Sequence, residues 1–449
     1  MTTSAIATNL STLLSKQRPH DAHASLTQLQ PADAAEQLDQ LTTLQVIQLL
    51  GLEPLTRRAQ VFGYFSLERQ VELSRALPRA ALATLIAAMS ADERADLFNR
   101  FDEEQREALL PALAQLERDD LRRLSSYLEG TAGALMTSEY STLKAGMSAS
   151  EAIAALRLGA ADAETIYQTY VLDDERRLLG TLSLRELILA TGDTPVSQLM
   201  VQPVISARVN DTQEQVAKKI GRYDLLALPI LDRDHRLVGI VTTDDALDVV
   251  EQEATEDFHK GASISLKIGN IKNATIGLLY RKRVFWLVLL VFGNLFSGAG
   301  IAAFEEIIAA NIALVFFLPL LVDSGGNSGS QAATLMVRAL ATGEVVMRDW
   351  LRLLGRECFV ALGLGLTMAL AVAGLGLMRG GLDIALVVAS SMVLIVIIGS
   401  LIGMSLPFLL SRMRLDPATA SAPLITSIAD ATGVLIYLGI ASQVLDLSV

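Results

Sequence analysis

The sequence predicts a multidomain protein: an α-helical solenoid, a duplicated α/β unit and an all-α domain of five membrane-spanning helices. Three observations predict this fold class. Short amphipathic segments follow one another from about 31 to 128, a mixed strand and helix pattern occurs twice between 130 and 252, and long apolar stretches fill the chain after Lys272. The 449 residues are 51% hydrophobic with a mean hydropathy of +0.41, so part of the chain must lie in a membrane.

Composition excludes several classes of protein. The net charge of −12 and the lack of a clustered basic face argue against nucleic acid as a partner. The single Cys358 and four scattered histidines offer neither a disulfide framework nor a cysteine metal site. The N-terminus has no basic region followed by an apolar core, so no cleaved signal peptide is expected. No nucleophile, general base and orienting residue form a recognisable set, so we expect no enzyme.

The first domain, residues 1–129, is predicted to be a short helical solenoid. Segments such as RQVELSRALP and ADERADLFNRFD place apolar residues at helical spacing and end near Pro or Asp. On this pattern alone the domain would be an interaction or spacer domain. Its many carboxylates, including Asp92, Glu93 and Asp96, are interpreted as a solvated face.

The duplicated unit resembles a tandem of CBS domains, at 130–193 and 194–252. LMTSEY and LMVQPV open the two copies, and TLSLREL and IVTTDDAL close them. The resemblance implies an adenosine nucleotide such as ATP as a cofactor, bound at Ser183 with Glu186 and at Thr242 with Asp245. The same residues fit helix N-caps with an acidic residue in the first turn, and both interpretations stay open.

A connecting helix is predicted at 253–280, and the chain that leads into it is densely acidic. Its carboxylates are Asp244, Asp245, Asp248, Glu251, Glu253, Glu256 and Asp257. So many like charges repel one another unless cations or arginines neutralise them. This stretch is therefore either a solvated surface or a switch that responds to divalent cations.

The membrane domain, 281–449, contains five apolar stretches that are each long enough to cross about 30 Å of hydrocarbon. They are 284–304, 307–340, 354–378, 384–410 and 418–444. Lys and Arg flank them mainly on one side, at Arg281, Lys282, Arg283, Arg338, Arg348, Arg352, Arg356, Arg412 and Arg414. The positive-inside rule then predicts a multi-pass protein of the cell (inner) membrane with a cytoplasmic N-terminus and an external C-terminus.

Two polar features interrupt the apolar stretches. In LPLLVDSGGNSGSQAATL, Gly325, Gly326 and Gly329 would let helices approach closely, and a loosened turn there would expose backbone carbonyls. Asp430 falls near the middle of the last stretch, where a charge costs about 2.5–3.5 kcal/mol on insertion scales. Since no Lys or Arg lies in the central part of any stretch, a cation pathway is favoured over a buried ion pair or a protonated carboxyl.

Taken together, the motifs resemble the MgtE family of magnesium channels and transporters. The matching segments are GALMTSEY, AETIYQTYVLD, GTLSLRELI, DALDVVEQEATED, GGNSGSQAATLMVRALA, MRDW and DPATASAPLITSIADATG. The resemblance implies a homodimer whose pore lies between subunits, with Asp430 facing a hydrated Mg²⁺ and Asp416 at the cytoplasmic mouth. It implies backbone carbonyls near Gly325 and Gly326 as further ligands, and Asp323 is an additional carboxylate where the family often has Gly.

The resemblance also implies regulation, in which cytosolic Mg²⁺ binds acidic surfaces of the soluble domains and closes the pore. The matching positions are Glu214, Asp224, Asp245, Asp248 and Glu256. The expected partners are Mg²⁺, other divalent cations such as Co²⁺ or Mn²⁺, membrane lipid and a second copy of the chain. The alternative function is a non-conducting CBS-containing membrane sensor that binds adenine nucleotide and partner proteins.

Overall fold

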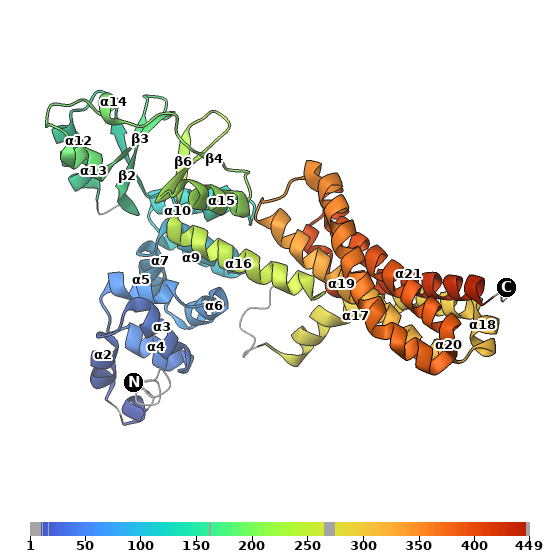
Figure 1. Cartoon of the computed structure of the whole chain (residues 1–449). Coiled ribbons are helices and arrows are strands. Elements are labelled where there is room, and N and C mark those ends of the chain that lie inside the picture. The colour runs from blue at the N-terminus through green and yellow to red at the C-terminus, as the bar shows by residue number, and fades with distance from the viewer. Residues whose placement is uncertain (1–9, 11, 17, 161–162, 265–273, 446–449) are drawn as a thin grey trace. The chain divides into compact units, whose positions relative to one another are not determined.

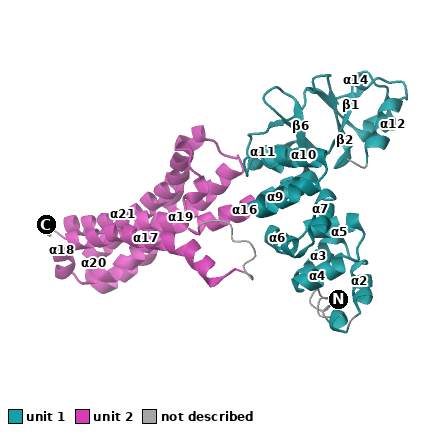
Figure 2. Ribbon diagram, turned by 180° about the vertical axis from the view of Figure 1, so that it is seen from behind, with its two compact units in different colours: residues 1–251 teal, residues 252–449 magenta. Residues whose placement is uncertain are grey.

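The structure, a computed structural model, describes residues 10, 12–16, 18–160, 163–264 and 274–445. The chain divides into two compact units, Met1–Glu251 (unit 1) and Gln252–Val449 (unit 2) (Figure 2). Each unit has its own hydrophobic core. The two are therefore described separately.

Unit 1 begins with short helices joined by tight turns (Figure 1). They are α2 Pro19–Leu26, α3 Pro31–Asp39, α4 Thr43–Leu50, α5 Leu55–Gly63, α6 Leu67–Ala76, α7 Arg79–Ala87, α8 Ala91–Arg100, α9 Glu103–Leu109, η1 Leu110–Ala112 and α10 Gln115–Leu124. Ser66 and Asp102 cap α6 and α9 by accepting hydrogen bonds from backbone N–H groups of the first turn. Apolar residues at helical spacing, such as Leu49, Phe62 and Leu97, are fully buried between these helices.

The two α/β repeats of unit 1 each contain a three-stranded mixed sheet. The first repeat holds α11 Ala132–Leu135, β1 Tyr140–Lys144, α12 Ala149–Gly159, β2 Thr165–Leu172, β3 Leu178–Ser183 and α13 Leu184–Leu189. The second holds α14 Val196–Leu199, β4 Ala207–Arg208, α15 Gln213–Tyr223, β5 Ala227–Leu231 and β6 Leu237–Thr242. In each sheet the first two strands are parallel and the last two antiparallel, with orders β1-β2-β3 and β4-β5-β6. The predicted duplication is confirmed.

Helix α16, Thr243–Gly261, directly follows β6 and extends from unit 1 into unit 2. It begins earlier than the connecting helix predicted at 253–280, because β6 ends at Thr242 and the helix starts without an intervening loop. Part of the predicted helix, residues 265–273, lies outside the described residues.

Unit 2 is all helical. Its elements are α17 Ile276–Ala303, α18 Glu305–Ala310, α19 Ala313–Ala341, η3 Met347–Asp349, α20 Trp350–Arg412, η4 Pro417–Thr419 and α21 Ala422–Val444. By length and composition, three helical segments of the described chain could cross a membrane, namely Ile276–Ala303, Met347–Arg412 and Ala422–Val444. Together with the helical region and the paired sheets, these long apolar helices confirm the predicted fold class, while the number of five spans stays a prediction.

Three of the predicted apolar stretches differ from the helices. The stretch 307–340 is divided between α18 and α19, because the backbone at Asn311 leaves the helical region. The stretches 354–378 and 384–410 both belong to α20, which contains a kink at Gly381 with φ 76° and ψ −166°. A residue with a Cβ is strained in that conformation, so glycine permits the chain to reverse there without a loop.

Candidate functional site

An acidic cluster in unit 1 lies where the first turns of α8 and α16 meet. Asp92 and Glu93 open α8, and Asp244 and Asp245 open α16. Asp92 and Asp245 interact electrostatically, and Asp96, one turn further along α8, is subject to the charge of Asp245 as well. The partial positive charges at both helix N-termini favour carboxylates there, but they cannot offset this many. We call Asp92, Glu93, Asp96, Asp244 and Asp245 the acidic cluster.

Burial and mutual repulsion make the acidic cluster reluctant to hold its full charge. Burial raises the pKa of Asp92 well above its usual value, and the charges of Asp245 and Glu93 raise it further. Burial also raises the pKa of Asp245 to about 6, although its hydrogen bond from Thr242 acts in the opposite direction. Protons or cations would therefore bind the cluster preferentially when it is assembled.

The acidic cluster is not a closed coordination shell. In the part of the chain that the structure describes, no three His, Cys, Asp or Glu side chains form a group that could hold a metal ion.

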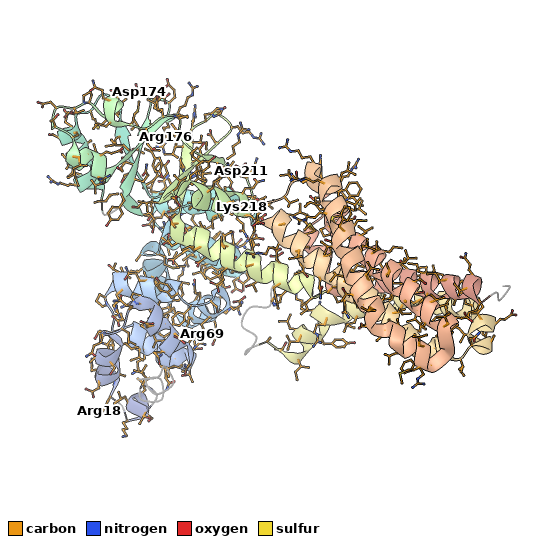
Figure 3. The ribbon with its side chains drawn as sticks, in the orientation of Figure 1. Arg18, Arg69, Asp174, Arg176, Asp211 and Lys218 are labelled. Carbon is orange, nitrogen blue, oxygen red and sulfur yellow. The ribbon has the colours of Figure 1, made fainter. Side chains whose placement is uncertain are left out.

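The residues implied as regulatory are only partly brought together. Asp248 lies one turn from Asp245 on α16 and raises the pKa of that carboxyl. Glu214 lies in the first turn of α15 and forms an ion pair with Lys218 at 2.8 Å (Lys218 is labelled in Figure 3). Asp224 directly follows α15 as its C-cap, with a left-handed backbone conformation. Within the described residues, neither of the two is seen to contact Asp245. Glu256, near the end of α16, forms an ion pair with Lys260 at 2.6 Å.

The sequence analysis interpreted Asp92, Glu93 and Asp96 as a solvated face and did not identify Asp245 as their neighbour. The available signal was the position of two of these carboxylates in the first turn of a helix, where anions are stabilised. That position does not reveal which residues lie nearby, because α8 and α16 are far apart in the sequence.

The residues implied for nucleotide binding currently cap helices. Ser183 accepts a hydrogen bond from the backbone N–H of Glu186 at 3.2 Å and donates to its carboxylate at 3.0 Å, which is a capping box. Thr242 donates to Asp245 Oδ2 at 2.6 Å at the equivalent place in the second repeat. Both polar pairs therefore lie where a strand passes into a helix, and the N-cap interpretation describes their present contacts.

In unit 2, the glycine-rich segment of α19 is a site of very close helix contact. A Cβ added to Gly329 would lie 2.6 Å from the carbonyl oxygen of Gly399, and one added to Gly403 would lie 1.9 Å from that of Gly329. Next to this contact, Ser328 and Ser400 share a buried hydrogen bond of 2.5 Å. The backbone is helical throughout α19, so of the two expectations for Gly325 and Gly326 the structure shows close helix contact and no loosened turn. Small residues serve close packing here.

Asp430 lies on α21 at the level of the polar residues of α19. A Cβ on Gly326 would contact Thr426 on α21, one turn before Asp430, and Asp323 is the charged residue that acts on Asp430. Asn327 donates a hydrogen bond to Asp323 at 2.9 Å. Asp430 Oδ1 is buried without a hydrogen-bond partner among the described residues. The charge of Asp323 therefore acts on Asp430, and in the described chain no cationic side chain is paired with Asp430.

Asp416 contacts the end of α16. Its Oδ1 accepts a hydrogen bond from Ala418 N at 2.9 Å, and its Oδ2 pairs with the ammonium of Lys260. Nearby, the hydroxyls of Ser263 and Ser421 are 2.6 Å apart. Lys260 was not identified from the sequence, since a lysine on an acidic helix is expected to pair within that helix.

Family models match the chain in three regions. Residues 318–440 match a model described as a divalent cation transporter, MgtE, residues 29–130 match the MgtE intracellular N domain, and 132–193 and 196–252 match CBS domains. These matches agree with a membrane protein that has an intracellular N-terminal domain.

Similar proteins and structures agree with the family models. The chain is 38% identical to the magnesium transporter MgtE of Thermus thermophilus, over 94% of each chain, and 33% identical to that of Bacillus subtilis, over 96% of this chain and 95% of the other. A crystal structure of the cytosolic domain of the Mg²⁺ channel MgtE in complex with ATP is 36% identical, with a TM-score of 0.52, and covers 54% of this chain and 99% of that one. The chain thus belongs to the MgtE family of magnesium transporters, and it is not an enzyme.

Proposed function

We propose that the chain forms a homodimeric, Mg²⁺-selective channel or transporter that mediates Mg²⁺ influx and is closed by cytosolic Mg²⁺. The observation that carries the proposal is Asp430, a carboxylate in the middle of an apolar helix, with a buried oxygen that has no hydrogen-bond partner among the described residues. A charged group at such a depth is costly, and the charged residues that are retained there typically mark an ion pathway.

The chemistry of this site suits a hydrated dication. Asp323 and Asp430 supply two carboxylates, and Asn327 orients the first of them. Mg²⁺ gives up water reluctantly, so a few oxygen acceptors around an intact water shell are sufficient to select it. The backbone carbonyls of Gly325 and Gly326 are engaged in the helix but retain a second lone pair each for water. Co²⁺ and Mn²⁺ are the other dications that this site would admit.

Asp416 would attract cations at the cytoplasmic mouth. Its present partner is Lys260, so the last turn of α16 neutralises the carboxylate that an incoming ion would meet. Movement of α16 would therefore change the charge at the mouth, and this links the helix to the pathway.

Regulation would act through the acidic cluster, together with Asp248 and Glu256 on α16. A dication bound there relieves carboxylate repulsion only while α8 and α16 are in contact, and so it shifts the population toward the closed form. Glu214 and Asp224 would join this system from α15 across a subunit contact. When internal Mg²⁺ is low, repulsion loosens the assembly and the pathway opens.

The membrane arrangement belongs to the same proposal. We propose five spans, which adds α19 to the three segments named above and divides α20 at Gly381. They are α17, α19, the two halves of α20, and α21. The N-terminus is then cytoplasmic and the C-terminus external, in contact with lipid around the helices. The domains are 1–129, 130–193, 194–252, the connecting helix 253–280 and the pore domain 281–449.

Inward flow of Mg²⁺ needs no ATP, because a transmembrane potential of 100 mV is worth about 2.3 kcal/mol per charge.

ATP would bind in the CBS pair. A related cytosolic domain was crystallised with ATP, and the Ser183 and Thr242 hydroxyls occupy equivalent positions in the two repeats. Binding would require these hydroxyls to exchange their capping contacts for the ribose.

The test is Mg²⁺ uptake into proteoliposomes under an inside-negative potential with low internal Mg²⁺. We expect the native chain to transport and Asp430→Ala to fall to the level of empty liposomes. Asp383→Ala, which also removes an aspartate from unit 2, is the matched control and should transport normally. Equal traces from native protein and Asp430→Ala, with both folded, would refute the pathway and favour the non-conducting sensor.

A further inference from the structure

Four buried side-chain polar atoms of unit 2 have no hydrogen-bond partner among the described residues: His259 Nδ1, Ser297 Oγ, Ser391 Oγ and Asp430 Oδ1. Two of them, Ser297 Oγ on α17 and Asp430 Oδ1 on α21, lie on neighbouring helices near the carboxylate of the proposed pathway. Helices α17 and α21 pack against each other. A buried polar group without a partner is destabilising, so such groups are retained mainly where function needs them.

The contacts between α17 and α21 put Ser297 and Asp430 at the same level. A Cβ on Gly293 would lie 3.8 Å from Cβ of Ser427, and one on Gly300 would lie 3.2 Å from Val434. Ser297 comes one turn after Gly293 and one turn before Gly300, so it lies on the same face of α17. Asp430 occupies the corresponding place on α21, between Ser427 and Val434.

Ser297, like Ser391, differs from several other hydroxyl residues in the helices of unit 2. Ser324, Ser390, Thr426 and Thr432 each donate to the backbone carbonyl four residues earlier, at 2.6 to 2.9 Å. This bond is the usual way in which a serine or threonine inside a helix satisfies its hydroxyl. The Ser297 hydroxyl makes no such bond and remains available to a neighbouring helix.

The two atoms are not hydrogen-bonded to each other in the structure. We propose that Ser297 is a positioning residue for Asp430: its hydroxyl turns to donate to Oδ1 of Asp430 when the hydrated cation engages the other carboxylate oxygen. The inference rests on the proposed function and deepens it. A carboxylate held by one oxygen presents the second at a fixed distance and angle. It then recognises an ion through its water shell instead of rotating to bind it directly.

Ion selectivity is where this hydrogen bond should matter. Mg²⁺ demands near-ideal octahedral geometry and keeps its water, whereas Ca²⁺ accepts irregular shells of six to eight oxygens. A carboxylate that is free to rotate would favour direct contact with the ion that dehydrates more readily. Loss of the Ser297 hydroxyl should therefore weaken Mg²⁺ recognition more than Ca²⁺ recognition.

The experiment compares Ser297→Thr with Ser297→Val in the full-length protein, since the two new side chains have the same shape and differ only in the hydroxyl. Initial rates of Mg²⁺ and of Ca²⁺ uptake into proteoliposomes are measured over a range of external concentrations, with low internal Mg²⁺. We expect Ser297→Thr to stay within about twofold of native, and Ser297→Val to need about tenfold more Mg²⁺ for half-maximal rate. The ratio of Ca²⁺ to Mg²⁺ uptake should rise in Ser297→Val alone.

Controls separate positioning from packing. Ser390→Ala removes a hydroxyl that already has a carbonyl partner and should change neither half-saturation nor the ion ratio. If Ser297→Val does not fold, Ser297→Ala replaces it, because the smaller side chain creates no new contact. A purely structural role would lower the maximal rate for both ions and leave their ratio unchanged.

Identical half-saturation and ion ratios for Ser297→Thr and Ser297→Val would overturn the inference alone, as would equal defects in both variants. Native uptake that does not depend on Asp430 would overturn the proposed function, and this inference would fall with it.

Discussion

Helices meet in opposite ways in the two units. In unit 1, α8 and α16 approach each other through the carboxylates Asp92 and Asp245, which repel. In unit 2, α19 and α20 approach through Gly329, Gly399 and Gly403, whose backbones touch. The first contact depends on protons or cations, and the second needs nothing from solution. Unit 1 is therefore suited to sensing and unit 2 to holding a pathway of fixed shape.

The largest effect is expected from a substitution that breaks the backbone contact between α19 and α20 in unit 2. Gly403→Ala places a methyl group where a Cβ would lie 1.9 Å from the Gly329 carbonyl oxygen, so the helices must separate. Overpacking against backbone should cost about 3 kcal/mol or more, and we expect loss of folded protein. Thermal unfolding in detergent, followed by gel filtration, measures it.

Gly439→Ala is the matched control, because a Cβ at Gly439 meets nothing within 4 Å. It should leave the melting temperature unchanged or raise it slightly, since alanine favours a helix over glycine. A normal melting temperature for Gly403→Ala would contradict the close contact.

A smaller effect is expected when pH and Mg²⁺ are varied, because the contact between α8 and α16 in unit 1 depends on protons or cations. Burial is the main reason that the pKa of Asp245 is raised to about 6, well above the usual value for an aspartate, so the neutral carboxyl is favoured in the folded state. The stability that this supplies is complete below the unfolded pKa and is lost as pH rises through about 6. Mg²⁺ should therefore raise the melting temperature of the full-length protein clearly at pH 8 and little at pH 5.

Asp245→Asn sharpens this test, because it removes the charge and keeps the shape. In the absence of divalent cations at pH 8 it should stabilise the protein by on the order of 2 kcal/mol, with a reduced response to Mg²⁺. A full Mg²⁺ response in Asp245→Asn would show that the dication acts elsewhere. Glu175→Gln, in a surface turn of the first repeat, serves as the neutral control.

The smallest effect is expected at the end of α16, where the ammonium group of Lys260 pairs with two carboxylates. Lys260→Met removes the partner of Glu256 and Asp416 and should destabilise the protein by about 1 kcal/mol or less, because these side chains are partly exposed. Lys218→Met, which breaks the single exposed pair with Glu214, should cost less still. Thermal unfolding at low and high salt measures both, and equal values would mean that Asp416 does not depend on Lys260.

Much of the fold was predictable because it depends on local pattern. The repeated strand and helix order gave both CBS domains, and the apolar stretches gave the positions of the helices of unit 2. The breaks were harder to predict. Asn311 ends α18 within an apolar stretch, and Gly381 allows α20 to turn without the polar loop that usually marks a reversal.

The candidate sites, too, were predictable where they depend on local sequence and not where they depend on contacts between helices. Asp430 was recognisable from the sequence alone, because a single carboxylate in an apolar helix is anomalous wherever that helix packs. Its surroundings were not, since Asp323, Asn327 and Ser297 come from two other helices. The glycines of α19 were recognised, but whether they loosen the backbone or bring helices together depends on the facing glycines of α20.

The sequence by itself determined which segments are helices, strands and apolar stretches, the duplication, the family and the presence of an intramembrane carboxylate. These follow from periodicity, composition and motifs, which are properties of short segments. Only the tertiary structure decided that Asp92 meets Asp245, that Lys260 neutralises Asp416 and that α19 and α20 touch at their backbones. Each of these contacts joins residues far apart in the chain, and their energies depend on burial and distance, which no local pattern encodes.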